Sequence, residues 1–434
     1  MPVAWVFHAV ILQENQMKVL VVGSGGREAA MVWALAQAPN IEVFCAPGNA
    51  GIAEHATCVP MKATDINGLL SFAQREQIDL TVVGPEAPLV SGIADRFREE
   101  GLLVCGPSTT AARSEGSKAW FKRLLAKHNI PTAPFRVFAD KDNAFEYIRE
   151  RGVQNTVIKA DGPMGGKGVT LPYNTEEAKR DLEKFMVQGS PGETVVIEDR
   201  LVGVERSVMA ITDGETVYML PFTQDYKREG DADKGLNTGG MGAHTLELPT
   251  DEEARLSHIL RDVVVALAEE GCPYTGFIYL GFIMTANGPM VLECNCRLGD
   301  PEAQVILPSI NGNFAELCMA SAQGALHTVP APCRQKHALC LVLASGAYPG
   351  SSDRDDSVVG LDMVPKNGAL VFHAGTAKKN GVITTNKSGR VLNVVGLGRT
   401  LEDAHTAAYD AAAKVQFPGV KYRRDIGAEV IRST

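Results

Sequence analysis

The chain has 434 residues, of which 45% are hydrophobic and 21% charged, a composition typical of a soluble globular protein with about three domains at roughly 150 residues each. Lys and Arg number 42 against 51 Asp and Glu, so the formal net charge is −9. This excludes a broad basic surface for nucleic acid, and the absence of an apolar run of ~18 residues excludes a membrane span.

Nine cysteines without a C-x-x-C pair indicate a reduced, cytoplasmic protein. Glycine is over-represented, with 43 residues, or about a tenth of the chain against a usual ~7%. The glycines are clustered, and such clusters let backbone N–H groups approach phosphates closely. The composition therefore favours nucleotide or sugar-phosphate chemistry.

Residues 1–16 are interpreted as an extension that precedes the first domain, predicted at 17–122. Within that domain short apolar runs alternate with helical patterns, and each run ends in glycine or proline. The runs are Lys18–Val22, Ile41–Ala46, Leu80–Val83 and Leu102–Cys105. This alternation predicts a doubly wound parallel sheet, with ligands at the carboxyl ends of its strands.

The pattern changes to α+β in a second predicted domain, 123–330, and to a small mixed α/β domain at 331–434, with a Pro-containing stretch near 330 as the boundary. The predicted strands are Val157–Lys159, Thr194–Glu198, Arg206–Thr212, Thr216–Met219, Leu339–Ala344, Leu370–Ala374 and Arg390–Leu397. The predicted long helices are Glu176–Val187, Asp251–Glu270 and Leu401–Val415.

The first chemical motif is Gly23-Ser-Gly-Gly-Arg-Glu28, which follows a strand and precedes a helix. A helix N-terminus in this position can hold a phosphate or carboxylate. Glu28 stands where a dinucleotide fingerprint, G-x-G-x-x-G, requires glycine, so NAD binding is disfavoured. An anionic-substrate loop is favoured, and a plain tight turn stays open as the alternative.

A second glycine-rich loop spans Val157–Val169 and contains Lys159 and Lys167. Asp161 and Gly168 both break the Walker A pattern. The glycines still permit close backbone approach, and the lysines supply point charges for phosphate oxygens. The loop is interpreted as a flexible lid over a triphosphate, with a solvated turn as the alternative.

Two further segments give weaker signals. The strand Val195–Leu201 could present its backbone to an adenine edge and Glu205 could accept from ribose hydroxyls, although an edge strand ending in solvated acids fits equally well. The charged segment Gln224–Arg228 precedes the glycine-rich loop Asn237–Gly242, which could also be an exposed linker.

The sharpest motif is Val291–Glu302. On a strand, side chains alternate between faces, so Glu293, Asn295 and Arg297 share one face. A carboxylate and an amide oxygen suit Mg²⁺ bridging substrate phosphates, and an arginine beside them suits a carboxylate or phosphoryl oxygen. A structural ion pair between Glu293 and Arg297 is the alternative.

The order of these motifs is similar to that of the ATP-grasp superfamily of carboxylate–amine ligases. Within it, the strings resemble the phosphoribosylamine–glycine ligases (glycinamide ribonucleotide synthetases) of purine synthesis, from about Met17 to Ile431. The strings that carry the resemblance are Gly25-Gly-Arg-Glu28, Pro47-Gly-Asn-Ala-Gly51, Val83-Gly-Pro-Glu-Ala-Pro-Leu89, Asn237-Thr-Gly-Gly-Met-Gly242, Asn295-Cys-Arg-Leu-Gly-Asp-Pro-Glu302 and Arg423-Arg-Asp-Ile-Gly427.

The resemblance implies a doubly wound N-terminal (pre-ATP-grasp) domain, a central ATP-grasp domain and a small mixed α/β C-terminal domain. It implies ATP-dependent ligation of glycine to 5-phosphoribosylamine through a glycyl phosphate, with ATP as substrate and Mg²⁺ or Mn²⁺ as cofactor. The protein is expected to be a cytoplasmic monomer or weak homodimer. Ala29 and the lid residues 163–165 depart from the usual family pattern.

The resemblance also implies roles for individual residues. The site of glycine activation would contain Arg297, Asp225 and Lys227. ATP would be bound by Lys118, Lys159, Lys167, Glu198, Leu201 and Glu205. The metal would be bound by Glu293 and Asn295. The remaining substrate groups would be bound by Gly25, Gly26, Arg27, Glu28, Pro47, Gly48, Asn49, Glu86, Thr238, Gly239 and Gly240.

Two alternatives remain. A different ATP-grasp ligase, using formate or bicarbonate or resembling biotin carboxylase, would share the lid and metal strand but should lack the Gly84–Leu89 and Asn237–Gly242 strings. A non-catalytic nucleotide-binding relative is disfavoured because Lys159, Glu293 and Arg297 are intact.

Overall fold

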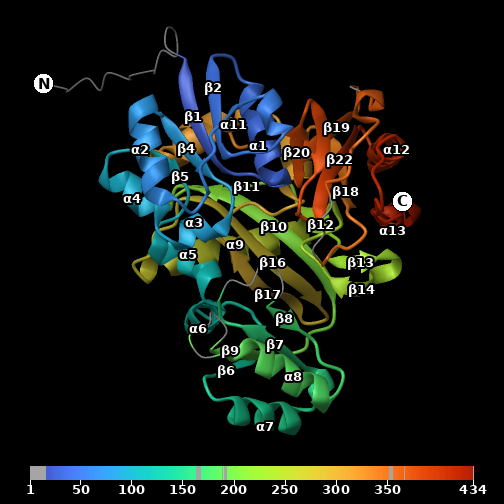
Figure 1. Ribbon diagram of the computed structural model, residues 1–434. Coiled ribbons are helices and arrows are strands. Elements are labelled where there is room, and N and C mark those ends of the chain that lie inside the picture. The colour runs from blue at the N-terminus through green and yellow to red at the C-terminus, as the bar shows by residue number, and fades with distance from the viewer. Residues whose placement is uncertain are drawn as a thin grey trace, which may run out of the picture.

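A computed structural model of the chain describes residues 16–433 except 163–167, 188, 190–192, 351–354 and 366. The predicted extension up to residue 15, Lys167 and the departures at 163–165 therefore lie outside the described residues. Figure 1 shows the N-terminal part (blue) and the C-terminal part (red) side by side at the top, the long strands β10 (Val204–Thr212), β16 (Gly276–Thr285) and β17 (Gly288–Asn295) below them, and a small unit at the bottom.

The N-terminal part is a parallel five-stranded sheet in the order β3-β2-β1-β4-β5, which confirms the predicted doubly wound fold. Val19 to Val22 are fully buried on both faces of the central strand, as expected for a parallel strand covered by helices on both sides. The strands are β1 Met17–Gly23, β2 Ile41–Pro47, β3 Thr57–Cys58, β4 Leu80–Val83 and β5 Val104–Cys105. The helices are α1 Gly26–Ala36, α2 Ile66–Glu76, α3 Glu86–Val90, α4 Ile93–Glu99 and α5 Thr109–Gly116.

A small unit at the bottom of Figure 1 has an antiparallel sheet in the order β6-β9-β7-β8. Two helices pack on it around a separate hydrophobic core that includes Ile148, Leu182 and Phe185. Its elements, with the helix that leads into it, are α6 Lys118–Lys127, β6 Phe135–Phe138, α7 Lys141–Arg151, β7 Thr156–Ala160, β8 Val169–Thr170, α8 Thr175–Phe185 and β9 Val195–Asp199.

The central sheet has nine strands and runs β17-β16-β10-β12-β15-β18-β22-β19, with β11 added beside β10. Its strands are β10 Val204–Thr212, β11 Val217–Met219, β12 Thr223–Asp225, β15 Gly242–Thr245, β16 Gly276–Thr285, β17 Gly288–Asn295, β18 His337–Ala344, β19 Ala369–His373 and β22 Arg390–Gly398. The helices of this part are α9 Thr250–Glu269, α10 Ala303–Ser309, α11 Phe314–Ala322, α12 Leu401–Ala412 and α13 Ala428–Ser433.

This sheet crosses the domain boundary predicted near residue 330, because β15 pairs antiparallel with β18, with Gly242 opposite Leu341. The boundary predicted after residue 122 falls inside α6. Buried apolar side chains also join the layers: one core cluster contains Leu20 of β1 together with Phe282 of β16. Strand pairing therefore joins the second and third predicted domains, and apolar packing joins the first domain to the central sheet.

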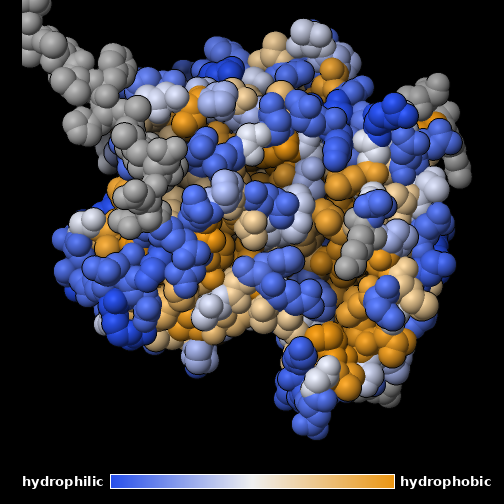
Figure 2. Space-filling view, turned by 90° about the horizontal axis from the view of Figure 1, so that it is seen from above, coloured by the Kyte–Doolittle hydropathy of each residue, from blue (hydrophilic) through white to orange (hydrophobic). Residues whose placement is uncertain are grey.

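Two short hairpins lie outside the large sheets. They are β13 Arg228–Gly230 with β14 Lys234–Asn237, and β20 Thr376–Lys379 with β21 Val382–Thr385. On the face seen from above, Figure 2 shows hydrophobic patches separated by hydrophilic residues. Within the described ranges, no helix is both long and apolar enough to cross a membrane.

Candidate functional site

Arg297, two residues beyond the end of β17, joins three separate segments of the chain. Its guanidinium lies 3.0 Å from Glu115 Oε1 at the end of α5, 3.4 Å from Glu86 Oε2 at the start of α3, and 3.1 Å from Asn295 Oδ1. Burial opposes the charge of Arg297, but the carboxylates of Glu115 and Glu86 raise its pKa above the usual value. The arginine is therefore a permanent cation between the N-terminal domain and the end of the central sheet.

Lys227 is the centre of a second charged group. Its Nζ lies 3.4 Å from Glu205 Oε2, 3.8 Å from Asp225 Oδ2 and 3.9 Å from Glu293 Oε1. The carboxylate of Asp225 contributes most to a pKa of Lys227 well above its ordinary value, against the effect of burial. The structure thus brings Glu293, predicted to bind the metal, close to Asp225 and Lys227, which were predicted in the site of glycine activation.

Asp225 is also the start of a buried polar chain. Ser207 Oγ donates to Asp225 Oδ1 at 3.1 Å and lies 3.0 Å from Tyr279 Oη. Glu302 is buried beside this chain, and burial, followed by the charge of Asp225, raises its pKa to about 7. Glu302 is a titratable group near the site that the sequence analysis did not single out.

The predicted ATP side of the site contains a buried ion network. Lys159 Nζ on β7 lies 3.0 Å from Glu198 Oε1, and Lys122 Nζ on α6 lies 3.0 Å from Glu198 Oε2. Lys122 also donates to Thr132 Oγ1 at 2.6 Å. Burial lowers the pKa of Lys122 to about 8, although Glu198 counteracts it. Glu198 is thus held by two lysines, and Lys122, one helical turn after Lys118, was missed because no motif contains it.

Lys118 begins α6 and donates from Nζ to the Gly162 carbonyl at 3.3 Å. Burial lowers its pKa, and the neighbouring charges of Glu293 and Lys159 act in opposite directions. Leu201 follows β9 and is partly exposed. Lys118, Lys159 and Glu293 therefore influence one another electrostatically, as groups around one polyphosphate would.

The residues predicted to hold a divalent cation fit oxygen coordination. Glu293 is about one-third exposed, and although burial raises its pKa, the charges of Lys227 and Lys159 outweigh that effect and lower it. Asn295 is 8% exposed, and its Nδ2 finds no hydrogen-bond partner among the described residues. A carboxylate and an amide suit a hard cation that takes its other ligands from phosphates and water.

Glu28 shapes the first glycine loop from within. Its Oε2 accepts from the Gly25 N–H at 2.5 Å and the Ser24 N–H at 3.1 Å, and its Oε1 accepts from Arg27 Nε at 2.6 Å. Glu28 is 3% exposed, and a Cβ on Gly23 or Gly84 would overlap its side chain. The glycines here make room for a carboxylate of the chain itself, a use that the sequence analysis did not foresee.

Asn49 ties three segments together. Its Nδ2 donates at 2.8 Å to the carbonyls of Ser24 and His373, and its Oδ1 accepts from the N–H groups of Gly51 and Ile52 at 3.0 Å. The turn of Pro47, Gly48 and Asn49 is therefore fixed against both the β1 loop and β19.

The loop of Thr238, Gly239 and Gly240 faces the C-terminal part. Arg390 donates to the Gly239 carbonyl at 2.8 Å and pairs with Asp300 at 3.0 Å. A Cβ on Gly240, whose φ is +111°, would lie 2.6 Å from Pro301 Cδ. Arg390 was missed because it lies outside every motif, whereas Asp300 stood unassigned within the Asn295–Glu302 string.

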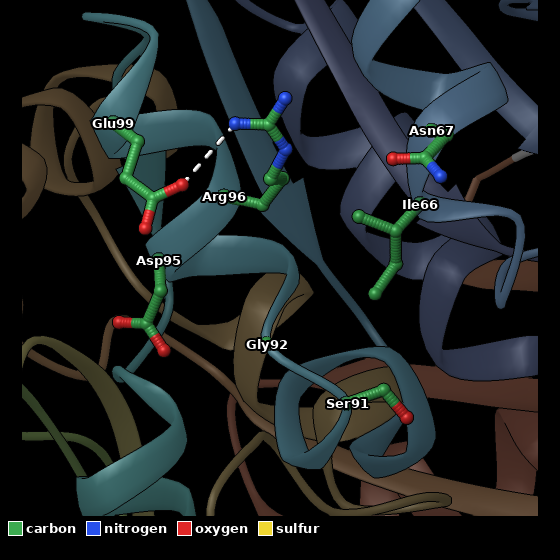
Figure 3. Close-up of a pocket in the computed structure, with 7 residues that line it drawn as sticks. All are labelled: Ile66, Asn67, Ser91, Gly92, Asp95, Arg96 and Glu99. Carbon is green, nitrogen blue, oxygen red and sulfur yellow. Dashed lines mark hydrogen bonds and ion pairs between the residues drawn. The ribbon is translucent and has the colours of Figure 1, made fainter.

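A separate hollow of about 380 Å³ lies between α2 and the α3–α4 region (Figure 3). Arg96 pairs with Glu99 there at 3.2 Å, and Asp95 accepts from the Thr109 N–H at 2.7 Å. It contains no residue predicted to bind substrate, ATP or metal, so we do not assign it to the site.

Three family models match the chain in order: the N domain of phosphoribosylglycinamide synthetase at residues 17–115, its ATP-grasp (A) domain at 116–303, and its C domain at 338–429. The chain belongs to the phosphoribosylglycinamide synthetase family. The match confirms the predicted family and its three-part architecture.

Individual relatives agree with this membership. The chain is 43% identical over 425 residues to the phosphoribosylamine–glycine ligase of Vibrio vulnificus (strain YJ016), covering 96% of this chain and 99% of the relative. The crystal structure of phosphoribosylamine–glycine ligase from Thermotoga maritima is 35% identical with a TM-score of 0.83, covering 94% of this chain and 100% of that one. A biotin carboxylase from Campylobacter jejuni shares the fold at 14% identity, with a TM-score of 0.72 and coverage of 94% and 93%.

The buried ion network predicts a large loss of stability on removal of Lys122. Lys122→Met should lower the free energy of unfolding by about 3 kcal/mol, because Glu198 keeps only Lys159 in a buried setting. Urea denaturation followed by circular dichroism measures this. Lys127→Met, on the same helix with an exposed pair to Glu270 at 2.6 Å, is the control and should stay close to wild type. Equal stabilities of the two variants would contradict the prediction.

The raised pKa of Glu302 predicts a pH-dependent stability. A carboxyl with a pKa of about 7 in the folded protein and its ordinary pKa of 4.5 in the unfolded chain stabilises the fold below pH 4.5 and loses that contribution as pH rises to about 7. Glu302→Gln removes this loss. The Tm of the variant relative to wild type should therefore be higher at pH 8 than at pH 5, and a pH-independent difference in calorimetry would refute the assignment.

Proposed function

We propose that this protein ligates glycine to 5-phosphoribosylamine at the expense of ATP, giving glycinamide ribonucleotide, ADP and phosphate. Family membership over nearly the whole chain supports the reaction. The observation that carries the proposal for this site is the meeting of Arg297 with Glu86 of the N-terminal domain and Asn295 of the metal strand. It brings the predicted acyl-activation groups beside the predicted sugar-phosphate loops.

The reaction needs activation because a carboxylate is a poor electrophile at neutral pH. A carboxylate oxygen of glycine attacks the γ-phosphorus of ATP, and ADP leaves. The amine of phosphoribosylamine then attacks the carbonyl of glycyl phosphate, phosphate leaves, and the nitrogen loses a proton. Phosphoryl transfer of this kind depends on positioning and on neutralising charge, for which the site's lysines and arginine are suited.

Lys118 and Lys159 are proposed to hold ATP phosphates, with Glu198 keeping Lys159 in its orientation through their 3.0 Å ion pair. Lys167, Leu201 and Glu205 keep their proposed roles toward ATP. Lys122 supports this side indirectly, because it pairs with the second oxygen of Glu198.

Glu293 and Asn295 would hold the divalent cation, Mg²⁺ or Mn²⁺. When bound, such a cation neutralises phosphate charge and acts as a Lewis acid. The lowered pKa of Glu293 keeps its carboxylate ionised at neutral pH, as a ligand must be.

Arg297, Lys227 and Asp225 are proposed to surround glycine. The guanidinium and ammonium groups suit the substrate carboxylate, and Asp225 suits its ammonium group. The negative net charge of the chain does not oppose this, since a few buried cations set the local potential.

Phosphoribosylamine is proposed to bind at Glu86 and at the loops of Gly25–Glu28, Pro47–Asn49 and Thr238–Gly240. Glu28 would act by fixing the loop, because the loop's own donors occupy its carboxylate. A cytoplasmic location and a monomeric or weakly dimeric state also remain part of the proposal, and neither nucleic acid nor membrane is proposed as a partner.

The proposed function is tested by following ADP release from purified protein with each substrate omitted in turn. Release should require glycine, phosphoribosylamine and the divalent cation together, with glycinamide ribonucleotide as the product in mass spectrometry. ADP release with formate or bicarbonate in place of glycine would indicate a different ATP-grasp ligase. Failure to release ADP with any of these, despite ATP binding, would indicate a non-catalytic relative.

Replacing the proposed metal ligand gives a sharper prediction. Glu293→Gln should lower cation-dependent turnover by at least the roughly 10- to 100-fold that loss of a metal-ligand partner costs. Folding should persist, since Glu293 is about one-third exposed. Glu253→Gln, an acid on the exposed surface of α9, is the control, and an unchanged rate in Glu293→Gln would remove this residue from the metal site.

A further inference from the structure

The hairpin of β13 and β14 requires support from elsewhere in the molecule. Among the described residues its two strands pair only with each other, and every residue of β14 is exposed. An isolated two-stranded hairpin is marginally stable in water. Its turn is also costly, because Ala232 and Asp233 both have positive φ, at 55° and 52°, a conformation that non-glycine residues rarely adopt.

The C-terminal segment Arg423–Asp425, which precedes α13, supplies that support. Arg423 donates to Asp233 Oδ1 at 2.7 Å, to the Arg228 carbonyl at 3.3 Å and to both oxygens of Asp425. Asp425 in turn accepts from the Ala232 N–H at 2.8 Å. These contacts, which we call the clamp, hold both the turn and one strand of the hairpin.

A further contact beside the clamp adds to it. The Arg424 N–H donates to Asp231 Oδ1 at 2.8 Å. Arg423 is 2% exposed, so its charge is removed from water and depends on these carboxylates. The clamp therefore differs from an exposed surface ion pair, because its arginine is buried and has several hydrogen-bond partners.

The same segment reaches the base of the hairpin. The guanidinium of Arg423 lies 4.9 Å from the centre of the Tyr226 ring, and the Gly427 N–H donates to Tyr226 Oη at 2.9 Å. Tyr226 precedes Lys227, whose carbonyl accepts from both the N–H and the hydroxyl of Thr238. The two ends of the hairpin are thus Lys227 on one side and the Thr238–Gly240 loop on the other.

We propose that Arg423 and Asp425 are positioning residues that fix, through the hairpin, the placement of Lys227 and the Thr238–Gly240 loop for the glycine and phosphoribosylamine steps. This inference rests on the proposed function for its catalytic consequence only. It assigns a role to the Arg423–Gly427 string, which touches no group predicted to react. The C-terminal domain then acts on catalysis by setting the geometry of residues contributed by the ATP-grasp domain.

Asp233→Asn tests the clamp at an exposed position. The side chain of Asp233 is 71% exposed and asparagine tolerates positive φ, so the variant removes the charge without disturbing the core. We expect kcat/KM for glycine to fall about fivefold to tenfold, with the Kd for ATP unchanged and only a small fall in Tm, because Asp425 still pairs with Arg423 through both of its oxygens. Asp251→Asn is the matched control, since Asp251 is 75% exposed and pairs with Arg255 at 2.8 Å, and it should behave as wild type.

A second measurement is independent of turnover. Amide hydrogen exchange of the segment 227–238, without substrates, should be faster in Asp233→Asn than in wild type and in Asp251→Asn, because the Thr238 N–H bonds to the Lys227 carbonyl at the hairpin base. Arg423→Lys keeps the positive charge but loses the bidentate contact with Asp425, and it should also make amide exchange of this segment faster than in wild type. Exchange at the wild-type rate in both variants would overturn the clamp. A loss of ATP binding and of Tm as large as the loss of kcat/KM would also overturn it, because that pattern indicates general destabilisation.

The outcomes separate the two proposals. Wild-type protein that fails to ligate glycine to phosphoribosylamine overturns the proposed function, while the exchange experiment still decides the clamp. Active wild-type protein with an unaffected glycine kcat/KM in Asp233→Asn overturns the positioning role alone.

Discussion

Arg297 keeps a positive charge in a largely buried place because Glu115 and Glu86 face its guanidinium from two different helices. Both carboxylates belong to the N-terminal domain, whereas the arginine follows β17 of the central sheet, so the pairing exists only when the two are docked. Asn295 contacts the same guanidinium, so the proposed metal ligand, the proposed glycine site and the proposed sugar-phosphate loops meet at this one interaction. Charge pairing in a low-dielectric setting is strong, so these ion pairs hold the surrounding loops in a defined position.

The apolar packing acts in the same direction. One core cluster runs from Leu20 in the N-terminal sheet to Phe282 in the central sheet, so the two layers are not hinged on polar contacts alone. The small unit around Ile148 and Phe185 has a core of its own. The N-terminal domain is thus docked rigidly on the central sheet, whereas Lys159 belongs to a unit with a separate core.

The sequence was a good guide where periodicity and motif order carry the information. The strands that end at Gly23 and Val83 were recognisable from their apolar runs and the glycines after them. The shared face of Glu293 and Asn295 follows from strand geometry, whereas the strand predicted to continue to Arg297 ends at Asn295, and Arg297 lies in the bend that follows. Lys122, Glu115 and Arg390 were out of reach, because their importance comes from long-range pairing with no local pattern.

Glu28 marks a different limit of sequence reasoning. A glycine-rich loop before a helix indicates an anion site, yet here a carboxylate from the chain accepts from the loop's own N–H groups. The sequence pattern predicts the need for a negative group but does not say whether ligand or protein supplies it. Glu198 is a similar case, because the sequence does not say whether a ligand or the protein contacts its carboxylate. In the structure Lys122 and Lys159 each pair with one of its oxygens.

The continuity of the central sheet across β15 and β18 has a consequence for how this chain can be divided. Cutting between residues 304 and 337 would separate two hydrogen-bonded strands whose residues are almost entirely buried. Each fragment would then present an unpaired edge on a strand that is buried in the intact protein, and such an edge is a template for intermolecular pairing. The C-terminal part therefore supplies three strands, β18, β22 and β19, of a shared sheet, and its evolutionary loss or replacement would require a new strand to cover β15.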